Sequence, residues 1–142
     1  MSFDALGDLN WLAVIVAALA YFVLGAIWYA PPVFGKAWMR ATGFEDPAKG
    51  EGPGPAIYVA PLIGSIVAAV ATGMLAVSTA SNTISEGLVL GLVVGIGYAV
   101  AVVGIGAVFE TSKPEPLTWF FITAGYHLVG LILAAMIVSA WD

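Results

Sequence analysis

The sequence contains no cysteine and only one histidine among its 142 residues, and only 9% of them are charged. The absence of cysteine excludes a disulfide framework, a thiolate metal site and a cysteine nucleophile. An ordinary soluble domain is about 25% charged and about 45–50% apolar, whereas this chain is 61% hydrophobic. We therefore expect lipid, rather than water, to be the solvent for much of its surface.

Four apolar runs are each long enough to cross about 30 Å of hydrocarbon, which takes roughly 20 helical residues. They are expected at residues 9–30, 56–78, 86–109 and 117–141. The sequence thus predicts an all-α integral membrane protein, with one domain of four transmembrane helices in a compact bundle. The first run is expected to be a retained helix and not a signal peptide, because Asp4 and Asp8 stand where a basic region should be.

The first connection is predicted to have two parts. Residues 33–44 alternate aromatic and basic side chains and are expected to form a short helix in the membrane interface. Residues 45–55 are rich in glycine, proline and charge, which indicates a flexible linker.

Basic residues occur only in the first and third connections, as Lys36, Arg40, Lys49 and Lys113. The positive-inside rule places these connections in the cytoplasm and both termini outside. The expected location is the bacterial cytoplasmic (inner) membrane, with the lipid bilayer as a partner. Nucleic acid is not an expected partner of a chain with a net charge of −5.

Aromatic side chains near the ends of the runs are expected to anchor the helices at the water boundary. The predicted anchors are Trp11, Trp28, Tyr29, Trp38, Trp119 and Trp141.

Small residues recur at four-residue spacing in all four runs. Since no hydrophobic force joins helices in lipid, such residues are typical of close helix contacts. The glycines expected at these contacts are Gly64, Gly87, Gly91, Gly95 and Gly130. For any single run, the general abundance of glycine in membrane helices is an equal explanation, but recurrence in all four favours a compact bundle with faces left over for self-association.

Three stretches together resemble one bacterial membrane family. They are "LNWLAVIVAALAYFVLGAIWYAPPVFGKAWM", "EGLVLGLVVGIGY" and "GYHLVGLILAAMIVSAW". In order and spacing they are similar to the family known as domain of unknown function 1761. The resemblance implies a small protein of four transmembrane helices and implies no settled activity. Where the family pattern suggests serine in a Trp-Tyr-Ser-Pro turn, this chain has Ala30.

His127, the single histidine, stands near the midpoint of the last run. An ionisable group deep in a membrane helix is by default a candidate functional site. Because burial disfavours the charged form, a neutral imidazole bonded to a neighbour is expected. The alternatives are a structural histidine that joins two helices, a proton relay or ligand contact, and haem or metal ligation. One histidine per chain could ligate haem only together with a second subunit's histidine or a different axial ligand.

The helix face of His127 is expected to include Thr123 at i−4 and Gly130 at i+3. Tyr98 stands near the middle of the third run, which should lie antiparallel to the fourth. A Tyr98–His127 hydrogen bond is therefore predicted. Tyr21, Ser65 and Thr72 are further candidate partners.

Glu110 ends the third run, where a carboxylate opposes the helix dipole and needs a cationic partner. Lys113, Lys36 and Arg40 are available on the same side, and together with Glu110 they form a predicted cytoplasmic mouth. At the other end, Asn10 is expected to cap the first helix, and Glu86 is expected in the first turn of the third helix.

An enzyme is not expected. The glycines lack the strand context of a phosphate-binding loop, and the one histidine is far from every aspartate predicted at the water boundary. No cofactor is expected. The favoured function is a homo-oligomeric transport or channel-like protein for a small solute, ion or proton. The alternatives are an accessory subunit or scaffold of a membrane complex and, third, a haem-binding membrane protein.

Overall fold

The computed structural model describes residues 2–44 and 54–141 of the chain. These residues form helices and turns without a strand, so the predicted all-α fold is confirmed. Four helices are long and apolar enough to cross a membrane, as expected for a multi-pass membrane protein. They are α1 (Trp11–Trp28), α3 (Ala56–Thr79), the segment from Ile84 to Phe109, and α6 (Pro116–Ala140).

The third membrane helix is continuous but not regular. It consists of α4 (Ile84–Val94), the π-helical turn η4 (Gly95–Val100) and α5 (Ala101–Phe109). A π-helical turn widens the backbone spiral and re-aims the side chains that follow it. The directions in which the α5 side chains point therefore do not follow from the spacing of residues on α4.

Short helices flank the first membrane helix. The 3-10 helix η1 (Phe3–Leu6) precedes α1, and the π-helical turn η2 (Pro31–Gly35) leads into α2 (Lys36–Thr42). The short helix expected over residues 33–44 thus spans the end of η2 and all of α2. The linker expected over residues 45–55 lies outside the described residues, apart from Gly54 and Pro55.

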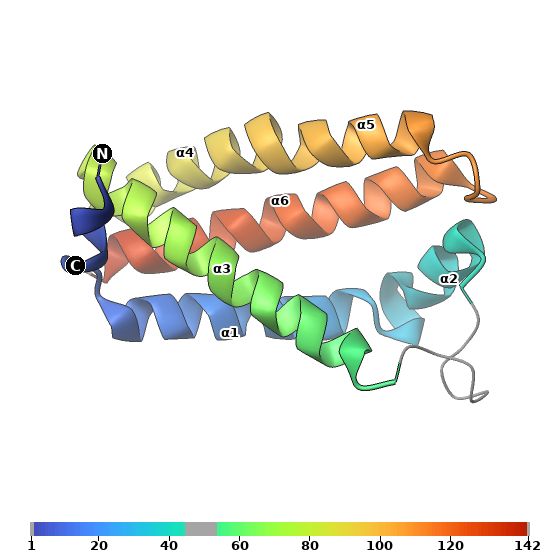
Figure 1. Ribbon diagram of the computed structural model, residues 1–142, viewed down its shortest axis with the longest axis horizontal. Coiled ribbons are helices and arrows are strands. Elements are labelled where there is room, and N and C mark those ends of the chain that lie inside the picture. Colours follow the sequence, from blue (N-terminus) through green and yellow to red (C-terminus); the bar gives the residue numbers. More distant parts are fainter. Residues whose placement is uncertain (1, 45–53, 142) are drawn as a thin grey trace.

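Helix α6 lies at the centre of the bundle (Figure 1), where it contacts α1, α3 and all parts of the third membrane helix. Helix α3 crosses the bundle diagonally. The start of α1 and the end of α6 lie at one end of the molecule, which we call the terminal end. Helix α2 and the α5–α6 connection lie at the opposite end, which we call the α2 end.

Asn10 and Glu86, which were expected at the N-terminal ends of helices, both make such contacts at the terminal end of the molecule. The Asn10 side chain accepts a hydrogen bond from the backbone N–H of Ala13 and so caps α1. At the start of α4, the Thr83 side chain accepts from the N–H of Glu86, and the Glu86 carboxylate accepts from the N–H of Asn82. This reciprocal arrangement satisfies N–H groups that have no partner inside the helix.

Glycines on α4 and η4 allow that helix to approach α6 closely. A Cβ atom added at Gly91 would lie 2.5 Å from the Cα of Ile132, and one at Gly87 would lie 2.7 Å from the carbonyl oxygen of Ala135. Gly95 faces Leu128 in the same way. The predicted contacts at these three glycines are therefore present.

The predicted packing role of Gly64 is wrong within this chain. Gly64 is exposed on α3, and a Cβ atom there would meet no described atom within 4 Å. Its position on the outer surface of α3 explains the difference, because four-residue spacing shows which residues share a helix face but not which face is buried.

Small side chains also fill the contact among α1, α3 and α6. Ala17, Ala69 and Ala134 are each 0% exposed, and Ala18 is 4% exposed. We call these four residues the alanine layer. Because a Cβ methyl is all that each contributes, the three backbones lie close together in the half of the bundle nearer the terminal end.

The glycine contacts predict that a glycine-to-alanine substitution changes stability differently at two positions. Gly91→Ala is expected to lower the free energy of unfolding by about 1–3 kcal/mol, because the new methyl group overlaps the α6 backbone. Gly64→Ala is the matched control, expected to be neutral or slightly stabilising because alanine favours helix. Thermal unfolding in detergent, followed by tryptophan fluorescence, measures both, and equal midpoints for the two variants would contradict the close contact.

Candidate functional site

A hydrogen bond between α1 and α6 lies near the middle of both helices. The Tyr21 hydroxyl oxygen is 2.7 Å from Nδ1 of His127, and the imidazole tautomer decides which group donates. The two rings meet edge to face at 82°. Tyr21 is only 3% exposed, so this polar contact lies within the helix bundle.

Gly130 is what allows Tyr21 into this position. The Tyr21 ring lies directly over Gly130, where a Cβ atom would overlap the ring carbons. One helical turn further along α6, Ala134 is fully buried. The predicted small-residue face of His127 is therefore present, and it receives a tyrosine from α1.

The predicted Tyr98–His127 hydrogen bond is wrong. Tyr98 lies in the π-helical turn η4 and is 69% exposed, while His127 bonds Tyr21, one of the further candidates. Similar depth in the membrane was the only basis for choosing Tyr98. Depth does not fix the direction of a side chain around the helix axis, and the π-helical turn changes that direction further.

Thr123 lies one turn before His127 on α6, as predicted, but the two side chains are not bonded to each other. The Thr123 hydroxyl oxygen is buried and has no hydrogen-bond partner among the described residues. An unpaired buried hydroxyl is uncommon, since leaving a polar group unsatisfied is costly. Thr123 therefore supplies a buried polar atom near the Tyr29 side chain, one helical turn from His127.

Aromatic rings continue from His127 toward the α2 end. Tyr126 packs between the rings of Tyr21 and Tyr29, at centroid distances of 5.2 and 5.3 Å. Tyr29 in turn contacts Trp38 of α2 at 5.5 Å. We call Tyr21, Tyr126, Tyr29 and Trp38 the aromatic row, and three of its four members carry a hydroxyl.

Sequence reasoning missed Tyr126, although it directly precedes His127. Its hydroxyl lies 3.5 Å from the backbone carbonyl oxygen of Tyr21, and its ring packs 4.8 Å from the imidazole. A tyrosine next to a mid-membrane histidine in "GYHLVG" was the available signal. Neighbours in a helix sequence point about 100° apart, so adjacency alone did not predict that both would face α1.

The predicted aromatic anchors divide into two groups. Trp11 and Trp141 are 49% and 44% exposed near the terminal end, as anchors would be. Trp28 is half-buried instead and donates from its indole nitrogen to the carbonyl of Ile122 at 3.0 Å. Trp28, Tyr29 and Trp38 therefore also hold α1, α2 and α6 together.

Charged residues gather at the α2 end. Lys113 lies 3.3 Å from the Glu110 carboxylate, which confirms one of the predicted partners, and its ammonium group lies 4.4 Å from the Trp119 ring centroid. Arg40 bonds Glu115 at 2.9 Å and thereby fastens α2 to the start of α6. The predicted mouth is thus two separate ion pairs, with Lys36 exposed nearby.

Hydrogen bonds lower the pKa of both carboxylates at this end. The pKa of Glu110 is lowered first by the Ser112 hydroxyl and then by Lys113. The pKa of Glu115 is lowered mainly by the hydrogen bond from Arg40 and also by Thr118. Both groups are exposed to solvent, so salt screens these interactions.

Because of the Tyr21–His127 bond, we expect Tyr21→Phe to lower stability and to change the imidazole resonance, and Tyr98→Phe to do neither. Removing the Tyr21 hydroxyl is expected to lower stability by roughly 0.6–2 kcal/mol, the usual range for a polar contact between membrane helices. Because His127 is the only histidine, ¹⁵N-histidine labelling gives ring resonances without ambiguity. We expect the Nδ1 resonance to shift in Tyr21→Phe and to stay in place in Tyr98→Phe; an unchanged resonance in both variants would contradict the bond.

The Arg40–Glu115 pair predicts an acid-dependent contribution to stability. A lowered pKa means that the ionised carboxylate stabilises the fold above the ordinary glutamate pKa of 4.5 and loses this effect as pH falls through the lower, folded-state value. Thermal midpoints measured from pH 6 down to pH 3 should therefore fall less steeply in Arg40→Gln than in the native protein. Lys36→Gln, which removes an exposed charge from the same helix, should keep the native slope.

Comparison with known proteins agrees with the predicted resemblance. No curated protein and no solved structure matches the chain. A family model described as "Protein of unknown function (DUF1761)" matches residues 12–139, a range that includes the Tyr21–His127 pair and all four membrane helices apart from the first residue of α1 and the last residue of α6. The chain belongs to the DUF1761 family.

Proposed function

We propose that this protein is a small transport or channel-like protein, which acts as a homo-oligomer and passes a proton or a small solute. The single observation that carries the proposal is the hydrogen bond between His127 and Tyr21 near mid-height of the bundle. A titratable group in a membrane helix is costly, and such groups commonly mark ion or proton pathways. Both members of this pair can give and accept a proton.

The surroundings of the pair differ on its two sides, which supports a directional role. Toward the α2 end, the ring of Tyr126 packs against both members of the pair, and the ring of Tyr29 packs against Tyr126. Toward the terminal end, the alanine layer closes the contact among α1, α3 and α6. In this conformation the His127 imidazole would exchange protons with the α2 side, and movement of α1 or α3 would be needed to reach the other side.

A homo-oligomer is part of the proposal because the packed core of one chain leaves no open route past the alanine layer. Gly97 on η4 lies on the outside of the bundle, with no described atom within 4 Å of an added Cβ. Small residues at such positions allow helices of neighbouring chains to approach closely.

The outward side of the third membrane helix favours a second candidate function. Leu88, Val93, Ile96, Val102 and Ile105 are all exposed there, and this helix is the least buried of the four. An accessory subunit or scaffold would use such a face to bind another membrane protein. Pulldown from native membranes in mild detergent tests this role, and recovery of the chain without a stoichiometric partner would count against it.

Proton flux into vesicles tests the transport proposal. The full chain would be reconstituted into liposomes that contain a pH-sensitive dye, and a potassium diffusion potential would drive proton entry. We expect the native protein to acidify the lumen faster than protein-free liposomes do. His127→Gln should reduce the rate of acidification to that of protein-free liposomes, because the glutamine amide cannot bind and release a proton near neutral pH.

Two further variants serve as comparison. Tyr98→Phe removes a hydroxyl from the outer surface and should keep the native rate. Glu110→Gln removes a charge from the α2 end and should lower the rate less than His127→Gln does. If the native protein moves neither protons nor potassium or sodium ions above the background, or if His127→Gln keeps the native rate, this proposal is wrong.

A further inference from the structure

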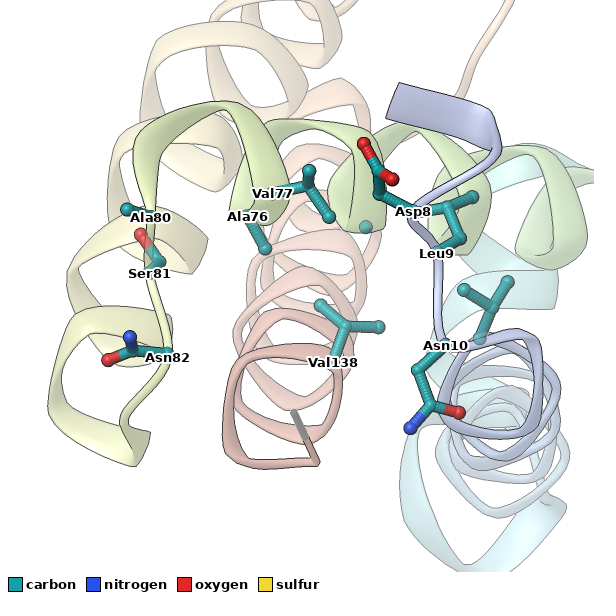
Figure 2. A pocket seen from close by; sticks show the side chains of 11 residues that line it. Asp8, Leu9, Asn10, Ala76, Val77, Ala80, Ser81, Asn82 and Val138 are labelled. Atoms are coloured by element: carbon teal, nitrogen blue, oxygen red, sulfur yellow. The ribbon is translucent and has the colours of Figure 1, made fainter. Parts of the chain in front are cut away.

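A cavity of about 300 Å³ opens at the terminal end of the bundle, between the start of α1, the end of α3 and the end of α6. Figure 2 shows Asp8 and Asn10 on one side of it, Ser81 and Asn82 on the other, and Val138 between them. Since one water occupies about 30 Å³ of liquid, the space would hold a group of several non-hydrogen atoms. The alanine layer separates this cavity from the Tyr21–His127 pair.

Two of the four polar side chains in the lining, Asn10 and Ser81, have partners within the protein, whereas the Asn82 side chain has none among the described residues. The Asn10 amide nitrogen donates to the carbonyl of Trp141 at 2.6 Å, and its oxygen accepts from Ala13. The Ser81 hydroxyl pairs with that of Thr79 at 2.8 Å. Within residues 2–44 and 54–141, by contrast, the Asp8 carboxylate has neither an ion pair nor a side-chain hydrogen bond.

The electrostatics of this end favour a cation. Asp8 is the one ionisable side chain in the lining. Of the basic residues that the structure describes, Lys36, Arg40 and Lys113 all lie at the α2 end, away from this cavity. The carboxyl end of α3 also contributes to the lining through Ala76, Val77 and Ala80, and the partial charge at that end of a helix is negative.

The apolar part of the lining favours an organic cation over a metal ion. Leu9, Val14 and Val138 form much of the wall, and a single carboxylate is fewer than the several oxygen ligands that Ca²⁺ requires. Apolar walls can instead cover the methylene groups of an alkylamine while its charged end meets Asp8.

We propose that this cavity binds a primary ammonium group, with the Asp8 carboxylate as its counter-ion and the wall formed by Leu9, Val14 and Val138 against its methylene carbons. The cavity lies at the ends of the apolar helices, near Trp11 and Trp141, where lipid headgroups and soluble amines are both within reach. The ammonium is supplied either by the headgroup of an aminophospholipid or by a free amine. This site does not depend on the proposed transport role of His127.

Native mass spectrometry of the full chain in detergent tests the proposal, with phosphatidylethanolamine, phosphatidylcholine and ethanolamine as probes. We expect phosphatidylethanolamine to be retained more strongly than phosphatidylcholine, whose quaternary ammonium has no N–H to donate. Asp8→Asn should weaken this retention about tenfold, which corresponds to the loss of one charge-assisted hydrogen bond. Asp4→Asn removes the same charge from the same end without touching the cavity and should bind as the native protein does.

The outcomes distinguish the two possible sources of the ammonium group, and they show when the proposal fails. Competition by free ethanolamine would identify a soluble amine as a sufficient ligand, and retention of the lipid without such competition would identify the headgroup. Val77→Phe, which narrows the opening while Asp8 stays in place, should weaken binding as well. Equal retention of the two phospholipids without ethanolamine binding, or native binding by Asp8→Asn, would overturn the proposal.

Discussion

Helices in lipid gain nothing by burying apolar surface against one another, so a membrane bundle depends on contacts close enough for van der Waals attraction. In this protein that constraint falls on α6, which touches each of the other membrane helices. Gly87 and Gly91 allow α4 to pack against the backbone of α6. Ala17 of α1 and Ala134 of α6 allow α1 to pack against a different side of α6.

The candidate site is a direct result of this close packing. Tyr21 reaches His127 only because Gly130 leaves room for the phenol ring beside α6. A larger residue at position 130 would displace the ring and with it the hydroxyl. Packing and polar contact therefore cannot be separated at this point, since the residue that allows the helices to approach also sets the geometry of the hydrogen bond.

The bundle has two chemically different halves. On the α2 side of His127, the aromatic row connects α1, α6 and α2, the Arg40–Glu115 pair joins α2 to the start of α6, and the Glu110–Lys113 pair lies in the α5–α6 connection. On the terminal side, the alanine layer fills the interior, and a cavity lined by the carboxylate of Asp8 lies beyond it. The proposed transport role would use this difference between the two sides of the Tyr21–His127 pair.

Composition and run length alone determined the four membrane helices, because 30 Å of hydrocarbon imposes the same requirement on every spanning segment. Local sequence also determined the caps at Asn10 and Glu86, since their partners lie within four residues. It offered three cationic partners for Glu110, and the structure decided for Lys113. Only the tertiary structure decided that Tyr21 and not Tyr98 meets His127, and that Gly64 faces outward while Gly91 faces α6. The physical reason is that depth in a membrane follows from position in the sequence, whereas rotation about the helix axis is fixed by the neighbouring helices and, in η4, by a π-helical turn that the residue pattern does not reveal.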